Sequence, residues 1–76
     1  MAAPVQLAAI DAGSNAIRLV IARATSPKNI EILDNERAAV RLGHNAFTRR
    51  VITGATISRA ARAFRQFRDR MDQYNV

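Results

Sequence analysis

A short segment near the start of the chain combines an acid, small turn-forming residues and a basic residue. These residues are Asp11, Gly13, Ser14, Asn15 and Arg18. Small residues leave backbone amides open to an approaching anion, and short polar side chains add further donors. A guanidinium binds phosphate through paired, charge-assisted hydrogen bonds. The combination predicts a loop that cradles a phosphate or a longer polyanion.

Asp11 needs a separate explanation, because a bare carboxylate would repel a phosphate. Beside an anion, its expected role is to hold a divalent cation, directly or through water, or to orient a water molecule. The alternative is an ordinary hairpin turn over residues 13–15 with Asp11 as its cap, and the local pattern alone favours this simpler interpretation.

The elements that must position these residues are two strands and a third that follows them. Residues 5–11 are nearly all apolar, which suits a strand covered on both faces. Residues 16–23 alternate, with Ile17, Leu19 and Ile21 on one face, so residues 5–23 are predicted to form a hairpin. A third strand is expected over residues 30–42, and its polar break at 34–35 indicates a bulge or a corner.

A long amphipathic helix is expected over residues 54–74, with Thr53 as its N-cap. Its apolar arc comprises Ile57, Ala60, Ala61, Ala63, Phe64, Phe67, Met71 and Tyr74. Its polar side comprises Arg59, Arg62, Arg65, Gln66, Asp69, Arg70, Asp72 and Gln73, with Arg68 at the edge. The spacings of Arg65 to Asp69 and of Arg68 to Asp72 predict ion pairs one helical turn apart. An apolar stripe of this kind ordinarily faces a core, but an incompletely covered stripe would leave self-association into a homo-oligomer open.

Composition restricts the chain to one domain at most and favours an anionic partner. The 76 residues include no cysteine and a single histidine, His44, so a thiolate or zinc site is not expected. His44 could act as a general base, although a solvated loop histidine is the simpler interpretation. The formal net charge is +6, and nucleic acid, polyphosphate and phosphorylated nucleotides all suit it.

The same charge leaves a second class of function open. Arg49, Arg50 and the helix arginines could bind nucleic acid as a small basic module, but only Phe47 lies among the loop arginines and no base-reading motif is present. We also find neither a secretory signal nor an apolar run of membrane-spanning length, so a cytoplasmic protein without membrane contact is expected.

The segment DAGSNAIRLVIA resembles the opening phosphate loop of the exopolyphosphatase and guanosine pentaphosphate phosphohydrolase family (Ppx/GppA). Further along, ILDNERAAVRLGHNAF resembles that family's third strand and Arg-Leu-Gly turn, and VITGATISRAARAFRQF resembles its first helix. The resemblance implies an α/β fold in which this chain is an α+β fragment of a ribonuclease H-like, actin-like ATPase domain. It implies a three-stranded antiparallel meander followed by one long helix.

The resemblance also implies an activity, which is release of terminal phosphate from polyphosphate or of the 5′ phosphate from guanosine pentaphosphate, normally with Mg²⁺. It implies phosphate contacts from Asp11, Gly13, Ser14, Asn15 and Arg18, a weaker one from Arg41, and metal binding by Asp11. The family's second glycine-rich loop and catalytic glutamate have no counterpart in these residues. We therefore expect residues 1–76 to be an incomplete first domain that is inactive alone.

Overall fold

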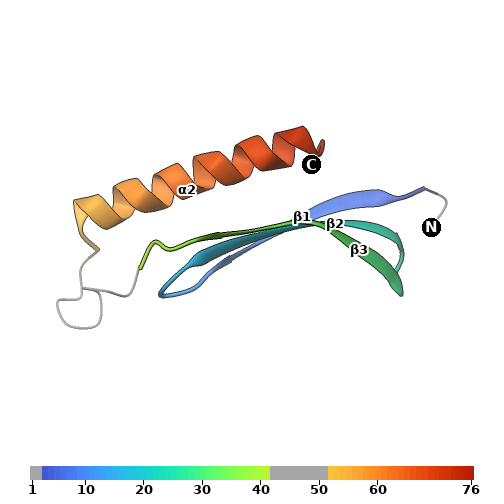
Figure 1. Cartoon of the computed structure of the whole chain (residues 1–76), viewed down its shortest axis with the longest axis horizontal. Helices are drawn as coiled ribbons and strands as arrows, with labels where there is room; N and C mark the ends of the chain where they lie inside the picture. The colour runs from blue at the N-terminus through green and yellow to red at the C-terminus, as the bar shows by residue number, and fades with distance from the viewer. Residues whose placement is uncertain (1–2, 42–51) are drawn as a thin grey trace.

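The computed structural model describes residues 3–41 and 52–76. Three strands form one antiparallel sheet in the order β1-β2-β3, and a helix lies along it (Figure 1). The strands are β1 (Val5–Ala12), β2 (Ile17–Ser26) and β3 (Asn29–Ala38), and the helix is α2 (Gly54–Gln73). The predicted meander followed by one helix is thereby confirmed.

The two hairpins keep a regular register over most of their length. β1 pairs with β2 from Val5 opposite Ala24 to Ala12 opposite Ile17. β2 runs three residues beyond its predicted end at residue 23, and Ser26 pairs with Asn29 across a tight turn at Pro27 and Lys28. Proline suits this turn because its fixed φ matches the first central position of common β-turns.

The third strand contains the predicted irregularity but is shorter than predicted. Ile21 pairs with Asp34 while Ala22 pairs with Ile32, so Leu33 is an extra residue and forms a bulge just before the predicted break. β3 ends at Ala38 and not at residue 42, and three residues further on Arg41 has a left-handed φ of 57°, outside the β region. Leu42 lies outside the described residues.

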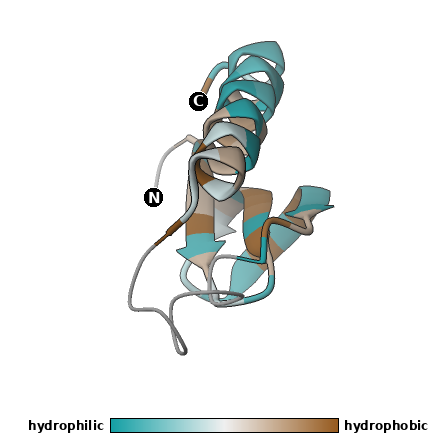
Figure 2. Ribbon diagram, turned by 90° about the vertical axis from the view of Figure 1, so that its left-hand side faces the viewer, coloured by the Kyte–Doolittle hydropathy of each residue, from teal (hydrophilic) through white to brown (hydrophobic). Residues whose placement is uncertain are grey.

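The core lies between α2 and one face of the sheet. Ile17, Leu19 and Ile21 are fully buried there, as their predicted alternation requires. They pack in one cluster with Val40, Ala63 and Phe67. Figures 1 and 2 show α2 along one side of the sheet, so its opposite face has no covering layer in the described part of the chain.

We call the face of the sheet away from α2 the open face. The register and the strand alternation assign to it Val5, Leu7, Ala9 and Asp11 of β1, Arg18, Val20, Ala22 and Ala24 of β2, and Ile30, Ile32, Asn35 and Arg37 of β3. The prediction that β1 is covered on both faces is wrong for the described residues, since Val5 and Leu7 remain 42% and 49% exposed. β1 is also an edge strand of the described sheet, with a hydrogen-bonded neighbour, β2, on one side only.

Both ends of α2 are capped by specific hydrogen bonds. The Thr53 hydroxyl oxygen accepts from the Thr56 amide at 3.2 Å, which confirms the predicted N-cap. At the other end, Asn75 has a left-handed φ of 58° and Val76 donates its amide hydrogen to the Met71 carbonyl at 2.9 Å. The last helical residue is Gln73, one position before the predicted end at residue 74, and Tyr74 is the C-cap.

The buried and exposed residues of α2 do not follow its predicted apolar and polar sides completely. Ile57 and Phe64 fall in the predicted core arc yet remain 56% and 43% exposed. Arg70, predicted on the outward side, instead forms ion pairs with β3. The predicted pairs from Arg65 to Asp69 and from Arg68 to Asp72 are not among the ion pairs of the described residues. Within residues 3–41 and 52–76, no helix is both long and apolar enough to cross a membrane.

Candidate anion-binding site

The loop that joins β1 to β2 is closed by its own backbone. The Gly13 amide donates to the Ala16 carbonyl at 2.9 Å, directly beyond the paired Ala12 and Ile17. A Cβ atom built on Gly13 would come within 3.3 Å of that same carbonyl oxygen, while its φ is outside the left-handed region. Glycine is therefore favoured here by a close backbone approach and not by a left-handed conformation.

This hydrogen bond corrects part of the expected chemistry. The Gly13 amide hydrogen is used inside the loop, so it is not a free donor for an anion. Ser14 and Asn15 are exposed at the tip of the loop. Their side chains can still donate hydrogen bonds, as expected from the sequence. Gly13 shapes the loop, and its neighbours are the groups that would touch a ligand.

Arg41, which follows β3, lies beside this loop. Its backbone amide donates to the Asn15 carbonyl at 2.8 Å, and its φ of 57° is left-handed. Such a conformation costs a non-glycine residue about 1–2 kcal/mol. The neighbouring Val40 is buried in the core and holds the backbone in place. Arg41 thus lies beside the predicted loop, although its contact with an anion stays a prediction.

Asp11 and Arg18 lie directly opposite each other where the hairpin approaches its loop. Directly opposite residues in an antiparallel pair point to the same face, so both side chains belong to the open face. Both are exposed, and neither takes part in an ion pair among the described residues. The carboxylate and the guanidinium are therefore both available to a ligand.

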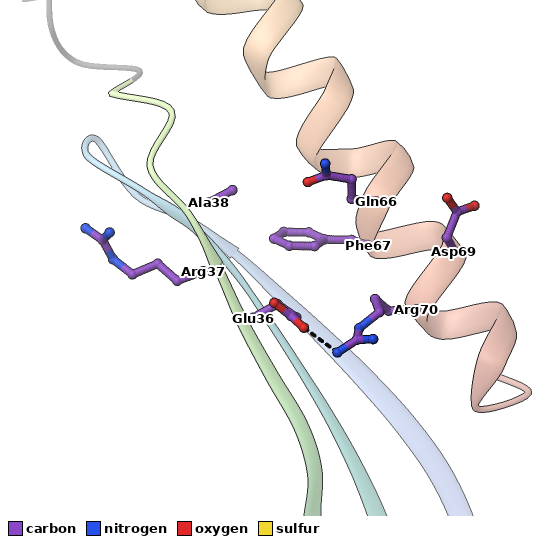
Figure 3. Close-up of a pocket in the computed structure, with 7 residues that line it drawn as sticks. All are labelled: Glu36, Arg37, Ala38, Gln66, Phe67, Asp69 and Arg70. Atoms are coloured by element: carbon purple, nitrogen blue, oxygen red, sulfur yellow. Dashed lines mark hydrogen bonds and ion pairs between the residues drawn. The ribbon is translucent and has the colours of Figure 1, made fainter.

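Arg37 completes this row and was not predicted from the sequence. It pairs with Arg18 across β2 and β3, so the three side chains Asp11, Arg18 and Arg37 form one row across the sheet. Figure 3 shows the Arg37 side chain extending away from α2. Strand alternation places Arg37 on one face, but only the register of the second hairpin shows that Arg18 is its neighbour.

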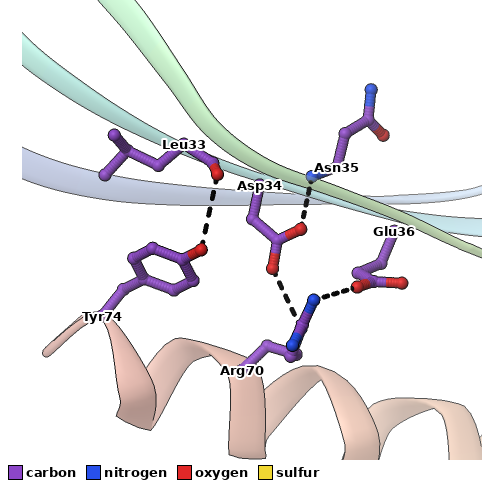
Figure 4. A network of polar contacts seen from close by, with 6 residues as sticks. All are labelled: Leu33, Asp34, Asn35, Glu36, Arg70 and Tyr74. Carbon is purple, nitrogen blue, oxygen red and sulfur yellow. Dashed lines mark hydrogen bonds and ion pairs between the residues drawn. The ribbon is translucent and has the colours of Figure 1, made fainter.

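Two carboxylates of β3, Asp34 and Glu36, face α2 and are paired with Arg70 (Figure 4). The Arg70 Nε lies 2.9 Å from the Asp34 Oδ2, and its Nη2 donates to the Glu36 Oε1 at 2.5 Å. The contact between the Asp34 Oδ2 and the Arg70 Nε is an ion pair only, since neither of these buried atoms forms a hydrogen bond. The hydrogen bond to Glu36, followed by the charges of Asp34 and Glu36, raises the pKa of Arg70 above its ordinary value.

Two further contacts fix the same end of the helix. The Tyr74 hydroxyl donates to the Leu33 carbonyl at 3.4 Å, and the Gln6 side-chain amide donates to the Tyr74 carbonyl. Tyr74 thereby joins the bulge of β3 to the edge strand β1. These contacts are structural, because they hold α2 on the covered face and involve no residue of the loop.

A pocket of about 320 Å³ lies between β3 and α2, on the covered side of the sheet. It is lined by Glu36, Arg37, Ala38, Gln66, Phe67, Asp69 and Arg70, although the Arg37 side chain itself extends away from α2 (Figure 3). Glu36 and Asp69 contribute negative charge, and the Arg70 guanidinium is already paired with Glu36. The pocket is therefore poorly suited to an anion, and it contains no residue of the predicted phosphate loop.

Comparisons with known proteins identify no relative. No family model matches the chain, and neither a curated protein nor a solved structure matches it.

Asp11 is the carboxylate closest in sequence to the loop and the predicted metal ligand. Residues 3–41 and 52–76 contain no group of three or more histidine, cysteine, aspartate or glutamate side chains that could hold a metal ion. Mg²⁺ often takes only one or two carboxylates and completes its shell with phosphate oxygens and water. Asp11 fits that pattern as a single protein ligand. His44, Arg49, Arg50 and Phe47 lie outside the described residues.

Proposed function

We propose that this chain supplies the first phosphate-binding loop of a phosphohydrolase with a ribonuclease H-like, actin-like ATPase domain. The substrate would be inorganic polyphosphate, which loses a terminal phosphate, or guanosine pentaphosphate, which loses its 5′ phosphate. The observation that carries the proposal is the convergence at one loop. Asp11 and Arg18 face each other at its base, and Arg41 is joined by a backbone hydrogen bond to Asn15.

Each residue has a defined role in this proposal. Arg18 and Arg41 supply permanent positive charge for phosphate oxygens, and the side chains of Ser14 and Asn15 add neutral donors. Gly13 permits the close backbone approach that forms the loop. Asp11 would hold Mg²⁺, which neutralises phosphate charge when bound.

Binding, and not hydrolysis, is the activity expected of these 76 residues. Hydrolysis needs a group that activates or orients the attacking water, and Asp11 is already committed to the metal in this proposal. The other carboxylates of the three strands, Glu31, Asp34 and Glu36, are paired with arginines. The chain is thus proposed to act as one lobe of a site that other residues complete.

Titration of the chain with tripolyphosphate in the presence of Mg²⁺, followed by calorimetry, tests the proposal. Gly13→Val should abolish binding, because its Cβ would lie 3.3 Å from the Ala16 carbonyl oxygen and its larger side chain would displace the loop. Gly54→Val is the matched control, since a Cβ at Gly54 meets nothing within 4 Å. Circular dichroism should show the same secondary structure for both variants. Equal affinity of both variants and the parent chain would refute the loop as the binding site.

A second candidate function is nucleic-acid binding through the outward face of α2. Arg62, Arg65 and Arg68 are exposed and form no ion pair among the described residues. A fluorescent single-stranded oligonucleotide would separate the candidates. The double variant Arg62→Gln with Arg65→Gln should weaken its binding under this alternative, whereas Gly13→Val should not.

A further inference from the structure

We propose that Arg37 is an additional anion-binding residue, and that the site extends from the loop across the open face of the sheet along the row Asp11, Arg18 and Arg37. The inference rests on the proposed function, since it enlarges the same site. It assigns to the ligand at least two anionic groups, one held at the loop and one held between Arg18 and Arg37.

The register of the sheet carries the first step. Arg18 pairs with Asp11 on one side and with Arg37 on the other. Directly opposite residues have Cβ atoms about 4.5–5.5 Å apart, so two guanidinium groups here can reach one anion together. Figure 3 shows the Arg37 side chain directed away from α2, toward the open face.

The charge balance carries the second step. Like charges directly opposite in a sheet are destabilising unless a counter-charge lies between them. Arg18 and Arg37 have no ion pair among the described residues, and the acids of β3 are engaged elsewhere. Glu31 pairs with Arg23 at 3.9 Å, while Asp34 and Glu36 pair with Arg70 on the covered face. Asp11 alone is left to offset two arginines, and the row keeps a net positive charge.

Continuity with the loop carries the third step. Asp11 is followed by Ala12 and Gly13, so the row begins at the base of the loop. Asn35, two residues from Arg37 and also on the open face, points away from Arg70 and α2 (Figure 4) and adds a neutral donor beside it. An anion that fills the loop and continues over the sheet would meet Arg18 first and Arg37 next.

Calorimetric titration of the 76-residue chain with tripolyphosphate and with inorganic phosphate, both in Mg²⁺, tests the inference. Arg37→Gln should weaken tripolyphosphate binding about tenfold, because one charge-assisted contact is lost, and should leave the weaker phosphate binding nearly unchanged. Lys28→Gln, in the exposed turn between β2 and β3 at the end of the sheet away from the loop, removes the same charge and is the matched control. It should change neither affinity by more than about twofold.

The outcomes separate this inference from the proposed function. If Gly13→Val abolishes binding while Arg37→Gln behaves as Lys28→Gln, the loop function stands and the extended row is refuted. If Arg37→Gln weakens binding and Gly13→Val does not, the row binds anions and the loop function fails. If the parent chain binds neither anion, both proposals are wrong.

Discussion

The two faces of the sheet are built from the same alternating strands but differ in burial. On the covered face, Ile17, Leu19 and Ile21 are fully buried beneath α2. On the open face, Ile30 and Ile32 remain 56% and 57% exposed. The difference shows that alternation selects the face of each residue, whereas burial depends on what the rest of the molecule places above that face.

The open face is itself divided along the strands. Near the loop, its row consists of Asp11, Arg18 and Arg37, and toward the other end its rows are apolar, such as Leu7 with Ala22 and Ile32. On the covered face, Asp34 and Glu36 are paired with Arg70, and Glu31 is paired with Arg23. Paired charges on one face stabilise structure, and unpaired charges on the other face are available for binding.

The largest effect is expected from shortening a buried side chain of the covered face, compared with an exposed side chain of the open face. Leu19→Ala should lower the free energy of unfolding by about 2–5 kcal/mol, because Leu19 is buried against the helix. Ile32→Ala, on the open face, should cost less than about 1 kcal/mol. Urea titration followed by circular dichroism measures both. Similar losses for the two variants would mean that the open face is also covered.

A smaller effect is expected from the attachment of the helix over the covered face. Thr53→Ala should cost about 0.5–2 kcal/mol, since its hydroxyl accepts the Thr56 amide at the start of α2. Thr53→Ser retains the hydroxyl and should restore most of the loss. Thermal melting checks the pair, and an equally stable Ala variant would show that packing alone fixes the helix start.

The two described glycines differ in the space around them, so substitutions in the loop and in the helix should have opposite effects on stability. Gly13→Ala should destabilise the chain by about 1 kcal/mol, because its Cβ meets a backbone oxygen at 3.3 Å. Gly54→Ala should be neutral or stabilising by up to about 1 kcal/mol, because its Cβ enters open space and alanine favours the helix. Denaturant midpoints report both changes. Destabilisation by both variants would contradict the glycine roles assigned here.

Much of the fold could be predicted because it is encoded locally. The alternation of Ile17, Leu19 and Ile21 predicts the buried face, and Thr53 predicts the helix start. Other features depend on contacts between distant segments. The turn of Arg41 onto Asn15, the pairing of Arg70 with β3 and the row that joins Arg37 to Arg18 all require the register of the sheet or the placement of the helix.

The candidate site was predicted in part for the same reason. Asp11, Gly13, Ser14, Asn15 and Arg18 are close in sequence, so one hairpin suffices to gather them. The use of the Gly13 amide within the loop could not be predicted, because glycine is equally compatible with a free amide and with a closed turn.

The smallest stability change is expected at the apolar end of the open face, where a substitution should change self-association more than folding stability. Ile32→Lys should alter the free energy of unfolding by no more than about 0.5 kcal/mol, because the side chain already faces water. Exposed apolar rows favour contact between copies, and an added charge opposes it. Sedimentation velocity over a range of concentrations should therefore show less self-association for Ile32→Lys than for Ser58→Lys, which adds the same charge to the exposed surface of α2. Equal association of both variants would place the contact elsewhere, and a strictly monomeric parent chain would show that the open face does not bind itself. In either case the two faces would still differ in burial, but the open face would no longer be a surface for self-association.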